Sequence, residues 1–393
     1  MNGKHVALAM VVIMLLGCVG CSSKAPAPAQ GTPAQGTPAQ GASEPIKIGS
    51  IAPLTGPIAT YGQSHRNAVD LAVAQVNEKG GIRGRQVKVI HEDSQGDPVV
   101  GANAALKLAE QDKVLAIIGP VASKVGMAAA PVAEQAKIPM VVTGTNPDIT
   151  KGKPFVFRSC WTDDFQGLVM AKFCTDKLQA KTAAVLYDLG NDYAKSVAEI
   201  FVKTFQDLGG KITTVQTHPT DATDFRAQLS TIKAGAPDVF FFSDFYNDAN
   251  LIGKQAREVG IKSTLVGCDG WDSPDLDLKA LDGAYYCSHF SKEDPRPETK
   301  AFVEAYKSKY GSDPDLLAIM AYDAAVMVLN SIDRAGDKMD SQSIRDAMAS
   351  IKGLKAAQGD ISLNENGDPT TLPAAVLLIK DGKTQYVQSF AAN

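Results

Sequence analysis

The sequence predicts an α/β protein built from two doubly wound lobes. Short apolar strands alternate with amphipathic helices, which is the pattern of parallel sheets covered by helices on both faces. Residues 45–393 are too long for a single hydrophobic core of ordinary size. The alternation of strands and helices runs twice, so we expect two sheets.

The first run of elements spans residues 46–142. Its first helix has Ala68, Leu71, Ala72 and Val76 at helical spacing, behind a short apolar strand. The same patterns predict strands at 46–52, 87–91, 114–118 and 138–142 and helices at 62–77, 98–110 and 123–135. We expect these elements to form the first sheet and its covering helices.

The second run spans residues 182–267, and a mixed C-terminal part follows it. The second run predicts strands at 182–187, 211–216, 239–242 and 263–267 and helices at 192–208, 225–234 and 248–259. The C-terminal part predicts helices at 297–310, 314–335 and 341–350 and strands near 374–380 and 385–390. Since these late elements follow both runs, they have to return to complete both lobes.

The N-terminus predicts export. Lys4 precedes a short apolar run and small residues, which is typical of a secretory signal. The apolar run is shorter than the about 20 residues that a membrane span needs. The segment Leu15–Cys18 also resembles the bacterial lipobox, which predicts a signal at 1–17 and a lipid on Cys18. Cys21 is a competing lipid site, with a signal at 1–20, and a plain cleaved signal is the alternative.

Residues 18–45 predict a linker behind this signal. Within it, residues 24–44 repeat Pro-Ala-Gln-Gly-Thr and have no large apolar side chain. Such a segment cannot bury enough surface to offset its ordering entropy, so we expect a disordered, semi-flexible spacer. A lipid and a spacer would hold the folded part near a membrane.

The composition argues against several classes of function. The formal net charge is −4 and no basic block is present, so a nucleic-acid partner is not expected. The five histidines lie far apart and show no metal-ligand spacing, so no metal is expected. No nucleophile elbow, nucleotide loop or dinucleotide fingerprint is present, so we expect no catalytic residue, no cofactor and no enzyme.

Four cysteines belong to the folded part. In an exported protein they are expected to form disulfides or to be buried free thiols. Cys268 and Cys287 lie between two predicted strands and are the better candidate pair. Cys160 with Cys174 is the weaker one, because the first is expected to end a strand and the second to lie along a helix.

From Ile46 onward the chain carries an ordered set of motifs, which are Ile46–Gly49, Pro53–Pro57, Tyr61-Gly62, Leu71–Val73, Asn77–Gly84, Glu92-Asp93, Asp97-Pro98, Ile117–Pro120 and Thr145–Pro147. With this set the chain resembles the substrate-binding proteins of branched-chain amino acid ABC transporters, the Leu/Ile/Val-binding type. The resemblance implies a type I periplasmic binding protein fold, whose two lobes are joined by three hinge crossovers. The implied lobes are 46–160 plus 289–365, and 161–288 plus 366–393.

The resemblance also implies where a ligand carboxylate would bind. Ser123 follows a strand and opens a helix, where free N–H groups and the helix dipole attract an anion. The alternative is that Ser123 only caps its helix. Thr143 and Thr145 occupy the second family position, where Thr143 offers a carbonyl and Thr145 a hydroxyl. A plain polar turn is the alternative there.

An α-ammonium group would need an acidic partner on the opposite lobe. The resemblance places Asp269 there, where many relatives have Glu, and an exposed turn aspartate is the alternative. Tyr61, Tyr193 and Phe245 match ligand-contact positions, and Trp271 is expected to line the side-chain pocket. Isolated aromatic residues are otherwise more often core or surface residues.

The expected function is therefore an exported, lipid-anchored binding protein of an ABC importer. It would bind a neutral apolar, branched-chain amino acid between closing lobes and deliver it to permease subunits with cytoplasmic ATPases. The expected location is the periplasmic face of a bacterial membrane or the outer surface of a Gram-positive cell membrane. A ligand-sensing subunit of the same fold, or a binder of a related small carboxylate, aromatic acid or amide, is the alternative.

Overall fold

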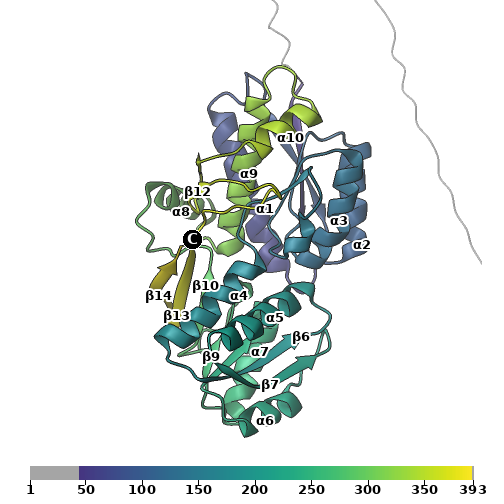
Figure 1. Ribbon diagram of the computed structural model, residues 1–393. Helices are drawn as coiled ribbons and strands as arrows, with labels where there is room; N and C mark the ends of the chain where they lie inside the picture. Colours follow the sequence, from purple (N-terminus) through teal and green to yellow (C-terminus); the bar gives the residue numbers. More distant parts are fainter. Residues whose placement is uncertain (1–43, 392–393) are drawn as a thin grey trace, which may run out of the picture. The chain divides into compact units, whose positions relative to one another are not determined.

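The computed structural model describes residues 44–391 (Figure 1). These residues form two α/β lobes, each built around its own sheet. The predicted signal, the linker and both candidate lipid sites, Cys18 and Cys21, lie outside the described residues. The α/β prediction is confirmed.

The first lobe contains a five-stranded parallel sheet. Its strand order is β2-β1-β3-β4-β5. The strands are β1 (Ile46–Ala52), β2 (Val87–Asp93), β3 (Ile117–Ile118), β4 (Met140–Val142) and β5 (Val156–Arg158). The helices are α1 (Ala59–Glu78), α2 (Pro98–Glu110), α3 (Ser123–Ala136), α8 (Pro297–Tyr310), α9 (Leu316–Arg334) and α10 (Ser341–Ala349). A small ribbon of β11 (Leu354–Lys355) and β12 (Asp360–Ile361) completes this lobe.

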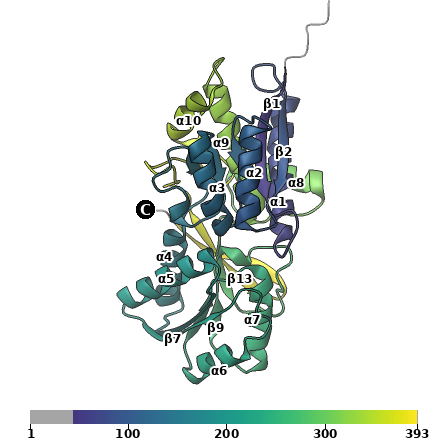
Figure 2. The same cartoon turned by 90° about the vertical axis from the view of Figure 1, so that its right-hand side faces the viewer.

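Helices cover both faces of this sheet. Neighbouring residues of a strand point to opposite faces, so Ile117 packs with the small side chains of α2 and α3, whereas Ile118 belongs to the larger core beneath α1 and α9. Figure 1 shows α1 beside α9, and Figure 2 shows α2 beside α3. This double coverage explains why the strands are apolar on both faces.

The second lobe contains a seven-stranded mixed sheet. Its strand order is β14-β13-β10-β9-β8-β6-β7; β13 pairs with both β10 and β14 in the antiparallel sense, and the other pairs are parallel. The strands are β6 (Thr182–Asp188), β7 (Lys211–His218), β8 (Val239–Phe242), β9 (Thr264–Val266), β10 (Tyr285–Ser288), β13 (Ala374–Lys380) and β14 (Lys383–Phe390). The helices are α4 (Asp163–Lys172), extended by η2 (Phe173–Lys177), α5 (Asp192–Asp207), α6 (Arg226–Ala234) and α7 (Tyr246–Glu258).

The chain passes between the two lobes three times. The passages lie between β5 and α4, between β10 and α8, and between β12 and β13. Each of the three expected lobe boundaries falls on or beside one of these passages, and we keep 46–160 plus 289–365 and 161–288 plus 366–393 as the proposed division. The late elements return to both lobes, as their position in the sequence predicted.

Helix α9 is long and apolar enough to cross a membrane by length and composition. It is the one helix of that kind in the described part of the chain, and most of its side chains are buried within the protein. Its apolar character is explained by its packing against α1 and the first sheet. It is therefore a core helix of the first lobe.

The predicted disulfide between Cys268 and Cys287 is wrong. Both residues are buried free cysteines, as are Cys160 and Cys174. Each thiol of the predicted pair has its own partner: the Cys268 Sγ lies 2.9 Å from the Tyr193 hydroxyl, and the Cys287 Sγ lies 3.9 Å from Gln166 Oε1. Cys268 follows β9, and Cys287 lies in the neighbouring strand β10. The two cysteines are therefore near each other in the fold, but no disulfide joins them.

Candidate ligand-binding site

Loops at the carboxyl ends of strands from both sheets enclose a cavity between the lobes. Seven of the eight residues that the sequence singled out line it. The full lining is Tyr61, Val121, Ala122, Ser123, Thr143, Gly144, Thr145, Tyr193, Phe245, Asp269, Gly270, Leu316, Leu317 and Met320. Carboxyl ends of parallel strands are where α/β proteins bind ligands, so this cavity is the candidate site.

The N-terminus of α3 forms part of the first-lobe wall. The residue before the helix is Ala122, and no side chain caps the first turn. The capping alternative for Ser123 is therefore wrong, since its Oγ instead accepts a hydrogen bond from the Asn146 N–H at 3.3 Å. The uncapped N–H groups and the Ser123 hydroxyl are left to face an anion.

The loop from Thr143 to Asn146 forms the rest of this wall and is held from behind by Arg158. The Arg158 side chain is fully buried, and its guanidinium donates to the carbonyls of Gly144 and Asn146, the latter at 2.7 Å. Its Nε pairs with Asp368 at 2.8 Å. A buried ion pair therefore fixes the carbonyl and hydroxyl groups that the loop presents.

Asp269 forms the acidic part of the second-lobe wall. It begins the short turn η3 (Asp269–Trp271) after β9, and it is only 3% exposed. Its Oδ1 accepts from the Tyr193 hydroxyl at 2.6 Å, and its Oδ2 lies 3.0 Å from His289 Nε2. A buried carboxylate held in this way is suited to a ligand cation.

Aromatic rings from both lobes complete the lining. Tyr193 stacks on Phe245 with ring centroids 5.1 Å apart, and Tyr61 meets Phe245 edge-on at 5.9 Å. Burial, followed by the charge of Asp269, raises the pKa of both tyrosine hydroxyls, so they act as donors at neutral pH. The Tyr61 hydroxyl donates to the Gly270 carbonyl, which links one lobe to the other.

Trp271 does not line the cavity, so its expected place in the side-chain pocket is wrong. Its side chain is fully buried in the core of the second lobe, against Phe242 at 4.5 Å and over Gly267, where a side chain would collide with the indole. The turn η3 explains this: two residues along a tight turn of three residues per turn point to different sides. Asp269 therefore faces the cavity while Trp271 faces inward.

Three apolar residues of α9 line the cavity and were not predicted to. Leu316, Leu317 and Met320 belong to the first turns of a helix that the sequence predicted, but its return to the cleft could not be read from local patterns. They add an apolar surface to the lining. No arginine or lysine belongs to the lining.

The described structure has the lobes closed over this cavity. Thr60 of the first lobe donates to Asp275 of the second, and the Tyr246 hydroxyl donates to the Pro57 carbonyl at 3.3 Å. Asn146 also reaches the Asp192 carbonyl at 3.5 Å. Contacts from both lobes therefore surround the site.

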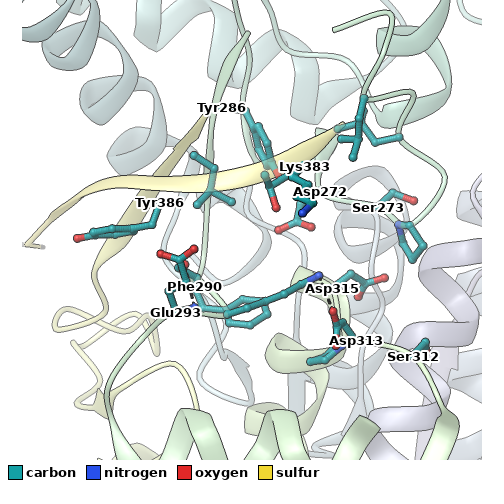
Figure 3. Close-up of a pocket in the computed structure, with 18 of the residues that line it drawn as sticks. Asp272, Ser273, Tyr286, Phe290, Glu293, Ser312, Asp313, Asp315, Lys383 and Tyr386 are labelled. Carbon is teal, nitrogen blue, oxygen red and sulfur yellow. Dashed lines mark hydrogen bonds and ion pairs between the residues drawn. The ribbon is translucent and has the colours of Figure 1, made fainter. Parts of the chain in front are cut away.

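A larger cavity of ≈ 560 Å³ lies elsewhere, beside β13 and β14, and shares no lining residue with the first (Figure 3). Its lining mixes the carboxyl groups of Asp272, Glu293, Asp313 and Asp315 with the ammonium groups of Lys292 and Lys383. The helix that begins there, α9, is capped by Asp315, which accepts from the Ala318 N–H at 2.9 Å. Size alone therefore does not identify the site. Within residues 44–391, no group of acidic, histidine or cysteine side chains could hold a metal ion.

Comparisons with known proteins agree with this fold. The model of the periplasmic binding protein family matches residues 45–383. The Leu/Ile/Val-binding protein BraC3 of Rhizobium johnstonii is 32% identical over 345 residues, which are 86% of this chain and 92% of that protein.

Two solved structures are similar over nearly their whole length. The leucine-binding protein LivK of Thermotoga maritima has 35% identity and a TM-score of 0.83, covering 88% of this chain and 98% of its own. The branched-chain amino acid transporter protein LivJ of Streptococcus pneumoniae, solved in complex with isoleucine, has 30% identity and a TM-score of 0.83, covering 88% and 99%. The chain belongs to the periplasmic binding protein family, with the type I fold. This is a family of solute-binding proteins of ABC transporters, not of enzymes.

Proposed function

We propose that the protein binds a neutral apolar amino acid, of the branched-chain type, between its two lobes. One observation carries the proposal: the cavity has an uncapped helix N-terminus on one lobe and Asp269 on the other. These are the complements of an α-carboxylate and an α-ammonium group. The relatives that bind leucine, isoleucine and valine support the same assignment.

The lining indicates the kind of side chain that the ligand carries. Leu316, Leu317, Met320 and Phe245 give the cavity an apolar side. The absence of lysine and arginine from the lining leaves no partner for an acidic ligand side chain. We assign Ser123, Thr143 and Thr145 to the carboxylate end, Asp269 to the ammonium end, and Tyr61, Tyr193 and Phe245 to packing around the ligand.

The ligand would stabilise the closed form because it contacts both lobes. Closure is then a population shift driven by a difference in affinity between open and closed forms. We propose that the closed, loaded form delivers the amino acid to permease subunits that work with cytoplasmic ATPases. Export, with a lipid on Cys18 or alternatively Cys21 and a flexible linker, would keep the binder close to that permease.

A thermal-shift screen of the purified protein tests the proposal. The probes are the common amino acids, small carboxylates, aromatic acids and amides. We expect leucine, isoleucine or valine to raise Tm most, because a ligand that binds only the folded state stabilises it. Stabilisation by aromatic acids or amides alone would favour the alternative ligands, and no stabilisation by any amino acid would contradict the proposal.

A further inference from the structure

His289 is the least expected neighbour of the site. It follows β10 on the second passage between the lobes, and it is 1% exposed. Its Nε2 lies 3.0 Å from Asp269 Oδ2, the carboxylate that we assign to the ligand ammonium. Because an ionised carboxylate only accepts hydrogen bonds, Nε2 must carry a proton for this contact to hold.

The other ring nitrogen is buried and unused. Among the described residues, His289 Nδ1 has no hydrogen-bond partner. The ring cannot easily turn to change this, since it stacks on Trp161 with centroids 3.6 Å apart and planes 14° apart. A neutral histidine whose proton sits on Nε2 therefore keeps Nδ1 as the atom that can take a second proton.

An acceptor for that second proton lies in the same core. The Gln358 side chain is close enough to His289 to raise its pKa, and Gln358 Oε1 is buried without a partner among residues 44–391. The amide of Gln358 is fixed in this orientation, because its Nε2 donates to the Ser159 carbonyl and to Asp323 Oδ2, both at 3.0 Å.

The charged groups around His289 come from several elements. Asp269 faces it from η3, Asp163 at the start of α4 lies close enough to Asp269 to feel its charge, and Asp323 on α9 holds Gln358. Glu293, Asp294 and Arg296 line a third cavity together with His289. Burial is the largest influence and lowers the pKa of His289 below its ordinary value, against the raising effects of Asp269 and Gln358. His289 is therefore neutral at pH 7.

We propose that His289 is a positioning residue for Asp269 and couples ligand binding to the loss of a proton. Neutral His289 orients the Asp269 carboxylate and leaves its charge to the ligand ammonium. Protonated His289 places a second cation beside the same buried carboxylate and competes with the ligand. This inference rests on the proposed function, since it requires a ligand that carries an ammonium group.

The sign of the pH dependence follows from linkage. A bound ammonium disfavours the imidazolium, so the pKa of His289 is lower with ligand than without it. Between those two pKa values, binding releases a proton, and the affinity falls by about tenfold for each pH unit of acidification. Above both values, the affinity does not change with pH through this group.

Calorimetric titration with isoleucine and leucine, between about pH 5 and pH 8, tests the proposal on wild-type protein and the H289Q variant. Glutamine can place an amide N–H near the position of Nε2 but takes up no proton. We expect H289Q to bind at the upper end of this range with nearly wild-type affinity, and to lose the acid dependence. An H289L variant, which lacks the donor, is expected to bind more weakly at every pH without a steeper acid loss.

The outcomes separate this inference from the function on which it rests. The same acid dependence in wild type and H289Q, or none in wild type, overturns the role of His289 and leaves the proposed function standing. No amino acid binding at any pH overturns the proposed function and this inference with it. Should H289Q fail to fold, titrations of wild type and H289L in buffers of different ionisation enthalpy still decide, because Asp163, whose buried carboxyl has a pKa of about 7, can also release a proton. We expect less proton release at acidic pH in H289L than in wild type, and equal release in the two contradicts the coupling.

Discussion

The two walls of the cavity solve the same problem, recognition of a small charged ligand, with different chemistry. The first-lobe wall uses helix N–H groups, hydroxyls and a loop held by Arg158, and it presents no ionised side chain to the cavity. The second-lobe wall uses one carboxylate, Asp269, supported by Tyr193 and His289. An anion can be held by many partial charges, whereas the ammonium depends on a single residue.

Closure and recognition are connected through this difference. In the binding mode that we propose, each end of an amino acid is complementary to one lobe only, so neither lobe alone satisfies the whole ligand. A ligand with both charged groups therefore favours the closed form, and one that lacks either group leaves buried polar groups unpaired. The walls should also respond differently to substitution, the first gradually and the second abruptly.

The largest expected effect is the loss of amino acid binding in D269N. The variant leaves a buried ammonium group without an ionised partner, which costs about 4–5 kcal/mol, at least a thousandfold in Kd. Calorimetry of leucine or isoleucine binding measures it. The matched control is D272N. The Asp272 carboxyl accepts a hydrogen bond from Ser288 and lines the larger cavity, so the affinity of this variant for the amino acid should stay near wild type. Equal affinity of D269N and wild type would remove Asp269 as the ammonium partner.

The next effect is expected on stability, at the support of the first-lobe wall. R158M leaves Asp368 without its buried partner and frees the loop at Gly144 and Asn146, so the free energy of unfolding should fall by about 3–5 kcal/mol. Denaturant unfolding measures it, with K203M as the control, because its pair with Asp207 is exposed and worth little. A double variant, R158M with D368L, should recover part of the loss, and no recovery would argue against an unpaired charge as its cause.

The pH dependence of stability should differ between the lobes. His65 in the first lobe is buried without partners for its ring nitrogens among the described residues, and burial lowers its pKa to about 3. Burial also acts to lower the pKa of His218 in the second lobe, but the hydrogen bond and charge of Asp244 outweigh it and raise that pKa to about 9.

The signs follow from the unfolded value of about 6.5. His65 binds its proton only when unfolded, so the first lobe should lose stability as the pH falls below about 6.5, by about 1.4 kcal/mol per unit at most. The stabilising contribution of His218 is complete below about 6.5 and should be lost as the pH rises through about 9. Hydrogen exchange resolved by lobe measures both trends, with H65L and H218Q as controls. Equal responses of the two lobes would contradict this assignment.

The smallest effect is expected on the first-lobe wall itself. S123A removes one hydroxyl while the N–H groups of α3 remain, so affinity should fall by roughly 1.5–3 kcal/mol, less than in D269N. Calorimetry of the same amino acid measures the change. S196A, a serine on α5 outside the cavity lining, is the control and should bind as wild type does. A loss as large as that of D269N would show that the anion depends on one group after all.

Much of the fold could be predicted, because its signals are local. The predicted ranges of β1, β8, β13, α2 and α8 agree with the structure at both ends. Asp97 caps α2 and Pro98 follows it, and both signals are visible in the sequence. Strand β5 and helix α4 were expected only as a strand ending at Cys160 and a helix along Cys174, without bounds: β5 has only three residues, and α4 is buried on several sides, which blurs its helical pattern.

The candidate site was predicted where a motif fixes a residue at the end of a strand. Ser123, Thr145 and Asp269 all follow strands directly, so their positions needed only the strand pattern and the resemblance. Trp271 was misplaced because a tight turn separates neighbours in sequence, and Leu317 was missed because it reaches the cavity through a distant chain passage. In the sequence, His289 stood out only as a histidine far from the others. Its contact with Asp269 depends on how the chain passes between the lobes, which the spacing of residues does not reveal.

We propose that each lobe recognises one of the two charged ends of the same amino acid. Calorimetric comparison of leucine with 4-methylpentanoic acid, which has the same carboxylate and a similar apolar chain but no ammonium, tests it most directly. We predict that the acid binds at least about a hundredfold more weakly, because Asp269 is left buried beside an apolar group. Equal affinity for the two compounds would contradict recognition of the ammonium group by Asp269.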